Sequence, residues 1–205
     1  MIKMVYKKSN ILKLEQQNRV LFDLFSKYYD YLLWVLNKAL KNVLSRVKIK
    51  NNSVILDAGC GTGNLLYMLS KNKTLKLEGV DINRNMLTEA RKKLGDKIRL
   101  RLMKIEDLKD KNKFDYVFCT EAFHHFQDQK KVMKNFYSSL KRGGKLVLLD
   151  IDFGRIFNFV FNKLEPGNSK MNSKREFYNL FNKTGFKKIK QERIWFFLIL
   201  NIGEK

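Results

Sequence analysis

The chain is poor in cysteine and proline. It has one proline and two cysteines among 205 residues, and the cysteines, Cys60 and Cys119, lie far apart. Two distant thiols match neither a metal-binding spacing nor a disulfide framework, so we expect two free cysteines, a reducing compartment and no metal site.

Long hydrophobic runs are also absent. The longest, WFFLIL at 195–200, has the length of a strand and is too short to span a bilayer. The N-terminal residues include lysines but neither an apolar stretch nor a small-residue cleavage site, so no secretory signal is expected. These absences predict a cytoplasmic protein, and the length predicts one domain with at most a small appendage.

Acidic side chains are scarce relative to basic ones. The chain has 42 Lys and Arg against 20 Asp and Glu, which gives a net charge of +22. The excess is spread over residues 1–50, 51–150 and 151–205 alike, so there is no basic tail. Such a distribution is typical of lysine-rich solvated helix faces, and a dedicated site for nucleic acid or anionic lipid is the alternative.

Hydrophobic periodicity predicts an α/β fold. Apolar residues recur at helical spacing over 10–48, and from residue 53 short apolar runs alternate with amphipathic helices. The predicted strands are 53–57, 75–81, 97–103, 114–120, 145–152, 186–194 and 195–202. The predicted helices are 64–72, 83–95, 128–143 and 173–185, three of them with capping residues at Asn83, Asp128 and Ser173. Alternating strands and helices predict a parallel sheet covered on both faces, with an antiparallel last strand.

The most informative stretch is VILDAGCGTGNLL at 54–66, in which three glycines follow a predicted strand. In a strand–loop–helix unit the backbone N–H groups and the helix dipole meet at the carboxyl edge of the sheet. Gly59, Gly61 and Gly63 permit positive φ angles and close approach of a ligand. No Gly-Lys-Ser/Thr follows, which excludes a P-loop, and Asn64 stands where the dinucleotide fingerprint requires its third glycine.

Asp81 ends the second predicted strand, 18 residues after Gly63. An acidic residue at this place accepts hydrogen bonds from the vicinal hydroxyls of a ribose, and its charge disfavours a 2′-phosphate. The glycine loop and Asp81 together predict a ligand that contains a nucleoside.

Five ordered motifs within residues 53–152 resemble those of class I S-adenosylmethionine-dependent methyltransferases. They are VILDAGCGTGNLL, LEGVDINRNMLTEARKK, IEDL, FDYVFCTEAFHHFQD and LKRGGKLVLLD. The tail NSKMNSKREFYNLFNKTGFKKIK is similar to the end of small, stand-alone "type 11" members, and LFDLFSKYYDYLL to the start of the ubiquinone and menaquinone methyltransferase group. The resemblance implies a Rossmann-like, seven-stranded, mostly parallel sheet.

The resemblance also implies which residues hold S-adenosylmethionine. Asp57 and the loop that contains Gly59, Cys60, Gly61 and Gly63 would surround its methionyl part. This implies a binding loop that runs on directly from the first strand.

Further along the chain, the resemblance implies an adenosine site. Asp81 would hold the ribose, Ile82 and Met86 would pack on the adenine, and Ile105 would offer it a backbone N–H. The family often has an acidic residue where this chain has Lys104, and a charged lysine accepts no hydrogen bond. Glu106 or water would then take that place.

Methyl transfer from a sulfonium is an in-line displacement, in which the protein aligns the acceptor and excludes water. Thr120 and Glu121 would face the methyl group and the acceptor. A general base is needed only where the acceptor must lose a proton, and the candidates are His124 and Glu121. The alternative for His124 and its neighbour His125 is a structural wall of the site. Cys119 lacks the proline that accompanies a cysteine nucleophile, so we expect a buried thiol.

The expected organisation is an N-terminal helical lid or extension over 1–50 and a methyltransferase domain over 51–205, with a cap-like insert at about 151–172. The phenylalanines of the insert fit an apolar pocket for a small-molecule, lipid or quinone-like acceptor, with contact to an anionic membrane, or else core packing. Two alternatives stay open: an RNA methyltransferase that exploits the basic surface, and a non-catalytic cofactor-binding protein.

Overall fold

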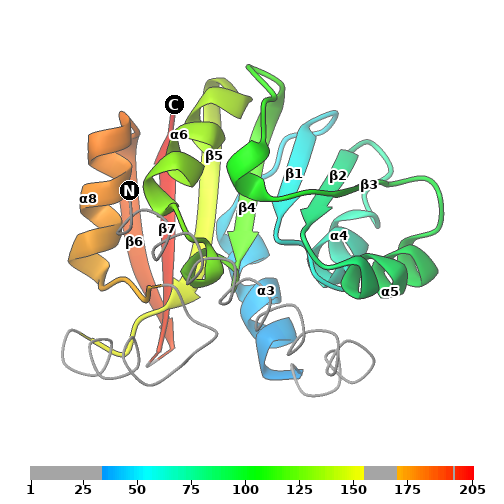
Figure 1. Ribbon diagram of the computed structural model, residues 1–205, viewed down its shortest axis with the longest axis horizontal. Helices are drawn as coiled ribbons and strands as arrows, with labels where there is room; N and C mark the ends of the chain where they lie inside the picture. The colour runs from blue at the N-terminus through cyan, green and yellow to red at the C-terminus, as the bar shows by residue number, and fades with distance from the viewer. Residues whose placement is uncertain (1–33, 155–169, 196) are drawn as a thin grey trace, which may run out of the picture.

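The computed structural model describes residues 34–154, 170–195 and 197–205 (Figure 1). These residues form a seven-stranded sheet in the order β3-β2-β1-β4-β5-β7-β6. The strands are β1 (Val54–Ala58), β2 (Lys76–Asp81), β3 (Arg99–Leu102), β4 (Phe114–Thr120), β5 (Leu140–Ile151), β6 (Lys187–Trp195) and β7 (Leu198–Glu204). Strands β1 to β5 pair in parallel, whereas β7 runs antiparallel to both β5 and β6. The predicted seven-stranded sheet with an antiparallel last strand is confirmed.

Helices cover both faces of the sheet (Figure 1). They are α3 (Trp34–Arg46), α4 (Asn64–Leu69), α5 (Arg84–Leu94), α6 (Gln129–Ser139) and α8 (Lys174–Thr184), with 3₁₀ turns η1 (Ile105–Asp107) and η2 (Phe123–His125). Consecutive strand residues point to opposite faces, so Leu56 packs with α6 and α8 while its neighbour Ile55 packs with α3 and α4. The sheet is therefore buried on both sides, as a parallel sheet requires.

The predicted helix caps are confirmed. Asn83 Oδ1 accepts hydrogen bonds from the backbone N–H groups of Asn85 and Met86, and Asp128 Oδ1 accepts one from Lys131 N at 2.9 Å. At the start of α8, Glu176 Oε2 accepts hydrogen bonds from Ser173 N at 2.9 Å and from Ser173 Oγ at 2.8 Å. These side chains satisfy backbone donors that the first helical turn leaves free.

The helix predicted over 128–143 ends earlier than expected. Helix α6 stops at Ser139, and Leu140 already pairs with Phe114 of β4. The next pair is Tyr116 with Lys145, so residues 141–144 form an irregular bulge within β5. Gly143 there has a φ of 76°, a conformation that interrupts a regular strand.

The N-terminal extension is described only in part. Helix α3 lies within it, while most of residues 1–50, including Tyr28 and Tyr29, and residues 155–169 of the insert fall outside the described ranges. In the described ranges no helix is long and apolar enough to cross a membrane. The same part of the chain holds no cluster of three or more His, Cys, Asp or Glu suited to a metal ion.

Candidate functional site

The glycine loop follows β1 and is fixed to β2. The backbone N–H groups of Gly59 and Cys60 both donate to Val80 O, at 2.8 and 3.0 Å. Gly59, Gly61 and Gly63 have φ angles of 77°, 51° and 79°, which glycine adopts without strain. The loop is thus held at the carboxyl edge of the sheet by bonds from its own backbone.

The three glycines are needed for different reasons. A Cβ atom on Gly59 would lie 2.5 Å from Ala122 Cβ, and one on Gly63 would lie 2.8 Å from Leu94 Cδ1. A Cβ atom on Gly61 would meet nothing within 4 Å. Gly59 and Gly63 therefore allow close packing within the protein, and only Gly61 has open space beside it.

Asp81, at the end of β2, organises the loops on either side of it. Its Oδ2 accepts a hydrogen bond from Gly61 N at 2.8 Å, and its Oδ1 accepts one from Asn83 N at 2.8 Å. Burial raises the pKa of Asp81, although backbone N–H groups that include these two act in the opposite direction. Each carboxylate oxygen keeps a further lone pair that can accept a hydroxyl hydrogen.

Two cavities lie along the carboxyl edge of the sheet. The larger, of about 110 Å³, lies between the segments that follow β2, β3 and β4. The smaller, of about 70 Å³, lies between the glycine loop, α3, the start of α4 and the end of β4. Gly59, Gly61 and Glu121 line both cavities, so the two meet at these residues.

The structure brings most of the predicted site residues together around these cavities. Those that line the larger cavity are Gly59, Gly61, Asp81, Ile82, Met86, Ile105, Glu106 and Glu121. Those that line the smaller cavity are Asp57, Gly59, Cys60, Gly61, Thr120 and Glu121. Two predicted residues line neither cavity: Gly63, which precedes α4, and His124.

Two carboxyl groups with an unpartnered oxygen lie beside the smaller cavity. Asp57 is 1% exposed and its Oδ1 has no hydrogen-bond partner. Burial, together with the charge of Asp81, raises the pKa of Asp57 to about 8. Glu121 Oε1 is shielded from solvent and also lacks a partner, and burial with the charge of Asp150 raises the pKa of Glu121 well above its usual range. Buried acceptors without partners are uncommon in proteins, so these two oxygens are candidates for contact with a ligand.

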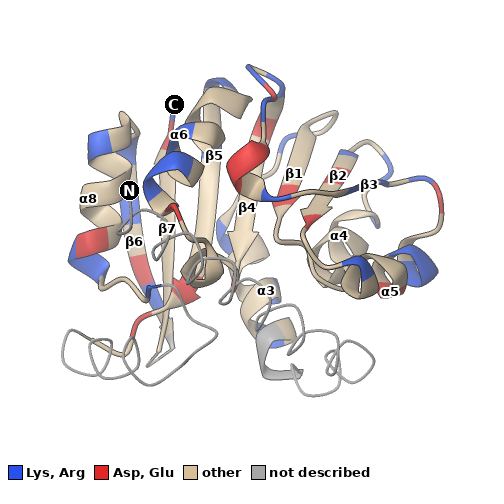
Figure 2. Cartoon of the chain, viewed as in Figure 1, with Lys and Arg blue, Asp and Glu red and all other residues tan. Residues whose placement is uncertain are grey.

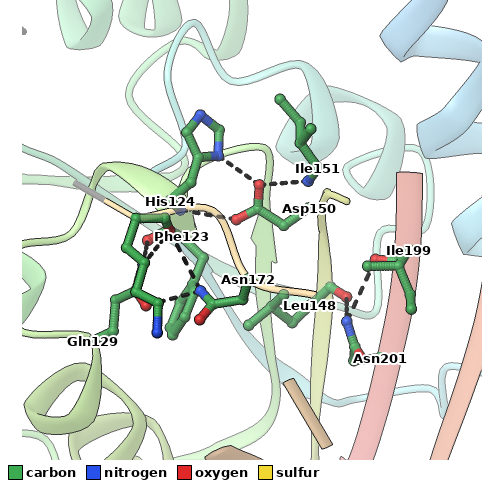
Figure 3. Close-up of polar contacts among 10 residues, drawn as sticks. Phe123, His124, Gln129, Leu148, Asp150, Ile151, Asn172, Ile199 and Asn201 are labelled. Atoms are coloured by element: carbon green, nitrogen blue, oxygen red, sulfur yellow. Dashed lines mark hydrogen bonds and ion pairs between the residues drawn. The ribbon is translucent and has the colours of Figure 1, made fainter. Parts of the chain in front are cut away.

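His124 lines neither cavity, and its ring points toward Asp150 (Figure 3). Its Nδ1 lies 2.5 Å from Asp150 Oδ1, and its backbone N–H donates to Asp150 Oδ2 at 2.9 Å. The neighbouring His125 lines the larger cavity, and the two rings are 4.0 Å apart between centroids. The structure therefore places His125, and not His124, beside the larger cavity.

The turn after β3 forms part of the wall of the larger cavity. Lys104, Ile105 and Glu106 line it together with Gln127, whose backbone N–H donates to Glu106 Oε1 at 3.2 Å. Asn135 Nδ2 donates to the carbonyl oxygens of Ile105 and Glu106 at 3.0 and 2.9 Å, which fixes the turn. Lys104 thus lies at the wall of the larger cavity.

Cys119 lies in the core. It is fully buried, and burial with the charges of Asp150, Asp57 and Glu121 raises the pKa of its thiol. A thiol held in the protonated form is a poor nucleophile, so its surroundings are those of a structural residue.

Comparison with known proteins assigns the family. A family model described as "Methyltransferase domain" matches residues 55–144, which include the glycine loop and most of the lining of both cavities. The ubiquinone/menaquinone biosynthesis C-methyltransferase of Wigglesworthia glossinidia brevipalpis is 30% identical over 155 residues, which are 68% of this chain and 62% of that protein. The chain belongs to the class I methyltransferase family. It spans about three fifths of the length of this curated relative.

Solved structures of methyltransferases share the fold. A chain of the complex with the Haloferax volcanii Trm112 methyltransferase activator has a TM-score of 0.75 at 20% identity, over 89% of this chain and 96% of that one. Phosphoethanolamine N-methyltransferase 2 of Haemonchus contortus, in complex with S-adenosyl-L-methionine, has a TM-score of 0.70 at 23% identity, over 84% of this chain and 43% of that one. The likeness to these structures therefore extends over most of the chain.

The residues that line the cavities of this methyltransferase fold include several that were not predicted from the sequence, among them Met103, Phe126 and Gln127. Met103 follows the short edge strand β3, and the other two follow η2. Met103 belongs to none of the quoted motifs, and Phe126 and Gln127 stand in FDYVFCTEAFHHFQD without a residue type that indicates a ligand. Each reaches the cavity through the path of a loop and not through a regular strand or helix.

Proposed function

We propose that this chain is an S-adenosylmethionine-dependent methyltransferase that acts on a small-molecule or lipid acceptor. The observation that carries the proposal is the pair of joined cavities, with Asp81 on one side of the junction and Asp57 on the other. The names of the relatives support it: a C-methyltransferase of ubiquinone and menaquinone biosynthesis and phosphoethanolamine N-methyltransferases.

The residues present fit this cofactor. Asp81 offers lone pairs for the ribose hydroxyls, and Ile82, Met86 and Ile105 provide apolar surface for the adenine. At the other end, Asp57 Oδ1 is a buried acceptor without a partner, which fits the α-ammonium group. Gly61 has open space where a side chain would otherwise project.

When bound, the cofactor supplies an electrophilic methyl group on a sulfonium. Residues of this chain bind the two ends of the cofactor, exclude water and hold the acceptor in line. Thr120 and Glu121, which line the smaller cavity at the end of β4, would face the acceptor. His125, beside the larger cavity, is better placed than His124 to take a proton from an acceptor.

The distribution of charge favours a small acceptor over RNA. Among the described residues, Figure 2 shows Lys and Arg on α5, α6 and α8 and on the loops between strands, and not gathered at one edge of the sheet. A nucleic-acid enzyme would gather its cations along the path of the phosphate backbone. We therefore expect the acceptor to be a small molecule or a lipid, as the names of the relatives suggest for their own acceptors.

The decisive experiment is calorimetric titration with S-adenosylmethionine and S-adenosylhomocysteine, followed by a screen with labelled methyl donor against metabolite, lipid and RNA fractions. We expect both ligands to bind and label to enter a metabolite or lipid fraction. If neither ligand binds, the chain is not an S-adenosylmethionine-dependent methyltransferase. If label enters RNA alone, the acceptor is RNA and not a small molecule or lipid.

A further inference from the structure

Glu121 occupies the point where the two cavities meet. The larger cavity extends from it toward Asp81 and Ile105, and the smaller toward Asp57 and Asn64. In S-adenosylmethionine the sulfur atom joins the adenosyl part to the methionyl part. If the ribose is held at Asp81 and the amino acid at Asp57, as the proposed function has it, the sulfur lies beside the residues that both cavities share.

The backbone holds Glu121 firmly at this junction. Its N–H donates to Leu149 O at 2.9 Å, which continues the pairing of β4 with β5 one residue beyond Thr120. Its φ is 54°, an unfavourable angle for a residue with a side chain. The next residue, Ala122, occupies the space that a side chain on Gly59 would need. Such a conformation persists only where the surrounding structure enforces it.

Glu121 Oε1 lacks the hydrogen-bond donor that most carboxylate oxygens at this edge of the sheet have. Other carboxylates at this edge have donors: Asp81 has Gly61 N and Asn83 N, and Asp150 has His124. Asp57 and Glu121 each keep a shielded oxygen without a hydrogen-bond partner. Burial and the charge of Asp150 raise the pKa of Glu121, so an ionised Glu121 is costly until a cation comes next to it.

The cofactor brings two positive centres to two carboxyl groups. Its α-ammonium is present before and after methyl transfer, whereas the sulfonium becomes a neutral thioether. We infer that Glu121 makes the site selective for the sulfonium of S-adenosylmethionine over the neutral thioether of S-adenosylhomocysteine. Asp57 binds the α-ammonium and treats the two ligands alike.

Glu121 would interact differently with the cofactor before and after methyl transfer. With the sulfonium bound, the carboxylate of Glu121 is compensated. With the thioether bound, no ion pair forms, and Glu121 either keeps a proton or stays ionised without a partner. The same residue therefore favours the methyl donor and disfavours the spent cofactor. A role for Glu121 as a base alone would alter the rate of transfer and leave the relative affinities of the two ligands unchanged.

The test is calorimetric titration of three ligands: S-adenosylmethionine, S-adenosylhomocysteine and sinefungin, in which an amine replaces the methyl sulfonium. They are titrated into the wild-type chain, Glu121→Gln and, as a matched control, Asp57→Asn. Glu121→Gln should reduce the preference for each cationic ligand over S-adenosylhomocysteine by about tenfold or more. Asp57→Asn should weaken all three ligands by similar factors and keep the preference within about twofold.

Several results would overturn the inference. An unchanged preference in Glu121→Gln would show that Glu121 does not read the charge, and an equal loss of preference in Asp57→Asn would show that the two carboxyl groups are not specialised. Thermal unfolding of each variant shows whether it is folded. Should Glu121→Gln not fold, the wild-type chain still gives a test, since equal affinity for sinefungin and S-adenosylhomocysteine would contradict the inference. Failure of all three ligands to bind would remove the proposed function as well.

Discussion

Gly59 and Ala122 approach each other so closely that a Cβ atom on Gly59 would lie 2.5 Å from Ala122 Cβ. Gly59 follows β1 and Ala122 follows β4, and these two strands are neighbours in the sheet. Their contact brings the glycine loop against the loop that carries Glu121. The width of the site between the two loops therefore depends on the absence of one methyl group.

The contact between Gly59 and Ala122 predicts a specific pattern of stability. Gly59→Ala introduces both a clash and a side chain at a φ of 77°, and should cost about 2–4 kcal/mol of unfolding free energy. In the double variant Gly59→Ala/Ala122→Gly the clash is removed and only the backbone strain remains. Denaturant unfolding of both single variants and the double variant measures the coupling. Purely additive effects would show that the contact does not limit the loop.

Gly61 provides the opposite case. A Cβ atom there meets nothing within 4 Å, so Gly61→Ala should cost only about 1–2 kcal/mol for its φ of 51°. The added methyl group projects into the open space beside both cavities and should weaken cofactor binding much more than Gly95→Ala, a glycine of similar φ with open space at the end of α5. Calorimetry on the two variants makes the comparison. Equal affinities would show that Gly61 does not face the ligand.

Local patterns made most of the fold predictable. Strand β1, the capped helices α5 and α8 and the antiparallel β7 follow from periodicity and capping residues that act within a few positions. The end of α6 could not be predicted from local patterns, because Leu140 leaves the helix to pair with Phe114, which lies 26 positions earlier in the chain. Sequence periodicity has no information on such a pairing, and tertiary context overrides local propensity.

The site was predictable where a motif fixes a backbone position, as for Gly61 and Asp81. The sequence could not predict which of His124 and His125 lines the cavity, because the two residues are adjacent and of the same type. Asp150, on a different strand, decides it by accepting hydrogen bonds from the ring and the backbone of His124. The unpartnered state of Glu121 Oε1 likewise depends on residues brought together only by folding.

Asp57 should make the stability of the chain fall as pH rises. Its pKa is raised from the ordinary value of 3.8 to about 8 in the folded chain, so between these two pH values the folded state keeps a proton that the unfolded state has released. The stability from this group is fully present below about pH 4 and is lost as pH rises through 8, by up to ~1.4 kcal/mol per pH unit. Asp57→Asn should flatten this slope and be the more stable protein at pH 8, while it weakens cofactor binding. Unfolding free energies from pH 5 to pH 8 provide the check, and parallel slopes for the two proteins would contradict the shift.

Removing the partner of His124 should mainly affect stability, whereas removing the ring of His125 should mainly affect function. Asp150→Ala leaves the ring of His124 and the backbone N–H groups of His124 and Ile151 without their acceptor, which should cost about 3 kcal/mol or more. His125→Ala removes a partly exposed ring from the cavity wall and should change stability by less than about 1 kcal/mol. The second variant should instead lower affinity or methyl transfer. Denaturant unfolding with calorimetry distinguishes the two, and a large loss of stability in His125→Ala would contradict this division.

The two thiols should report on the integrity of the core. Cys60 and Cys119 are both buried, and burial with nearby carboxylates raises the pKa of each thiol well above its usual value. Because the thiolate is the reactive form, labelling by an alkylating reagent at pH 8 should be slow in the native chain and fast in denaturant. Cys119→Ala should keep cofactor binding and cost about 1–2 kcal/mol through lost packing. Rapid native labelling that disappears in Cys119→Ala would instead reveal a reactive thiol at the end of β4, and would reopen a nucleophilic role for it.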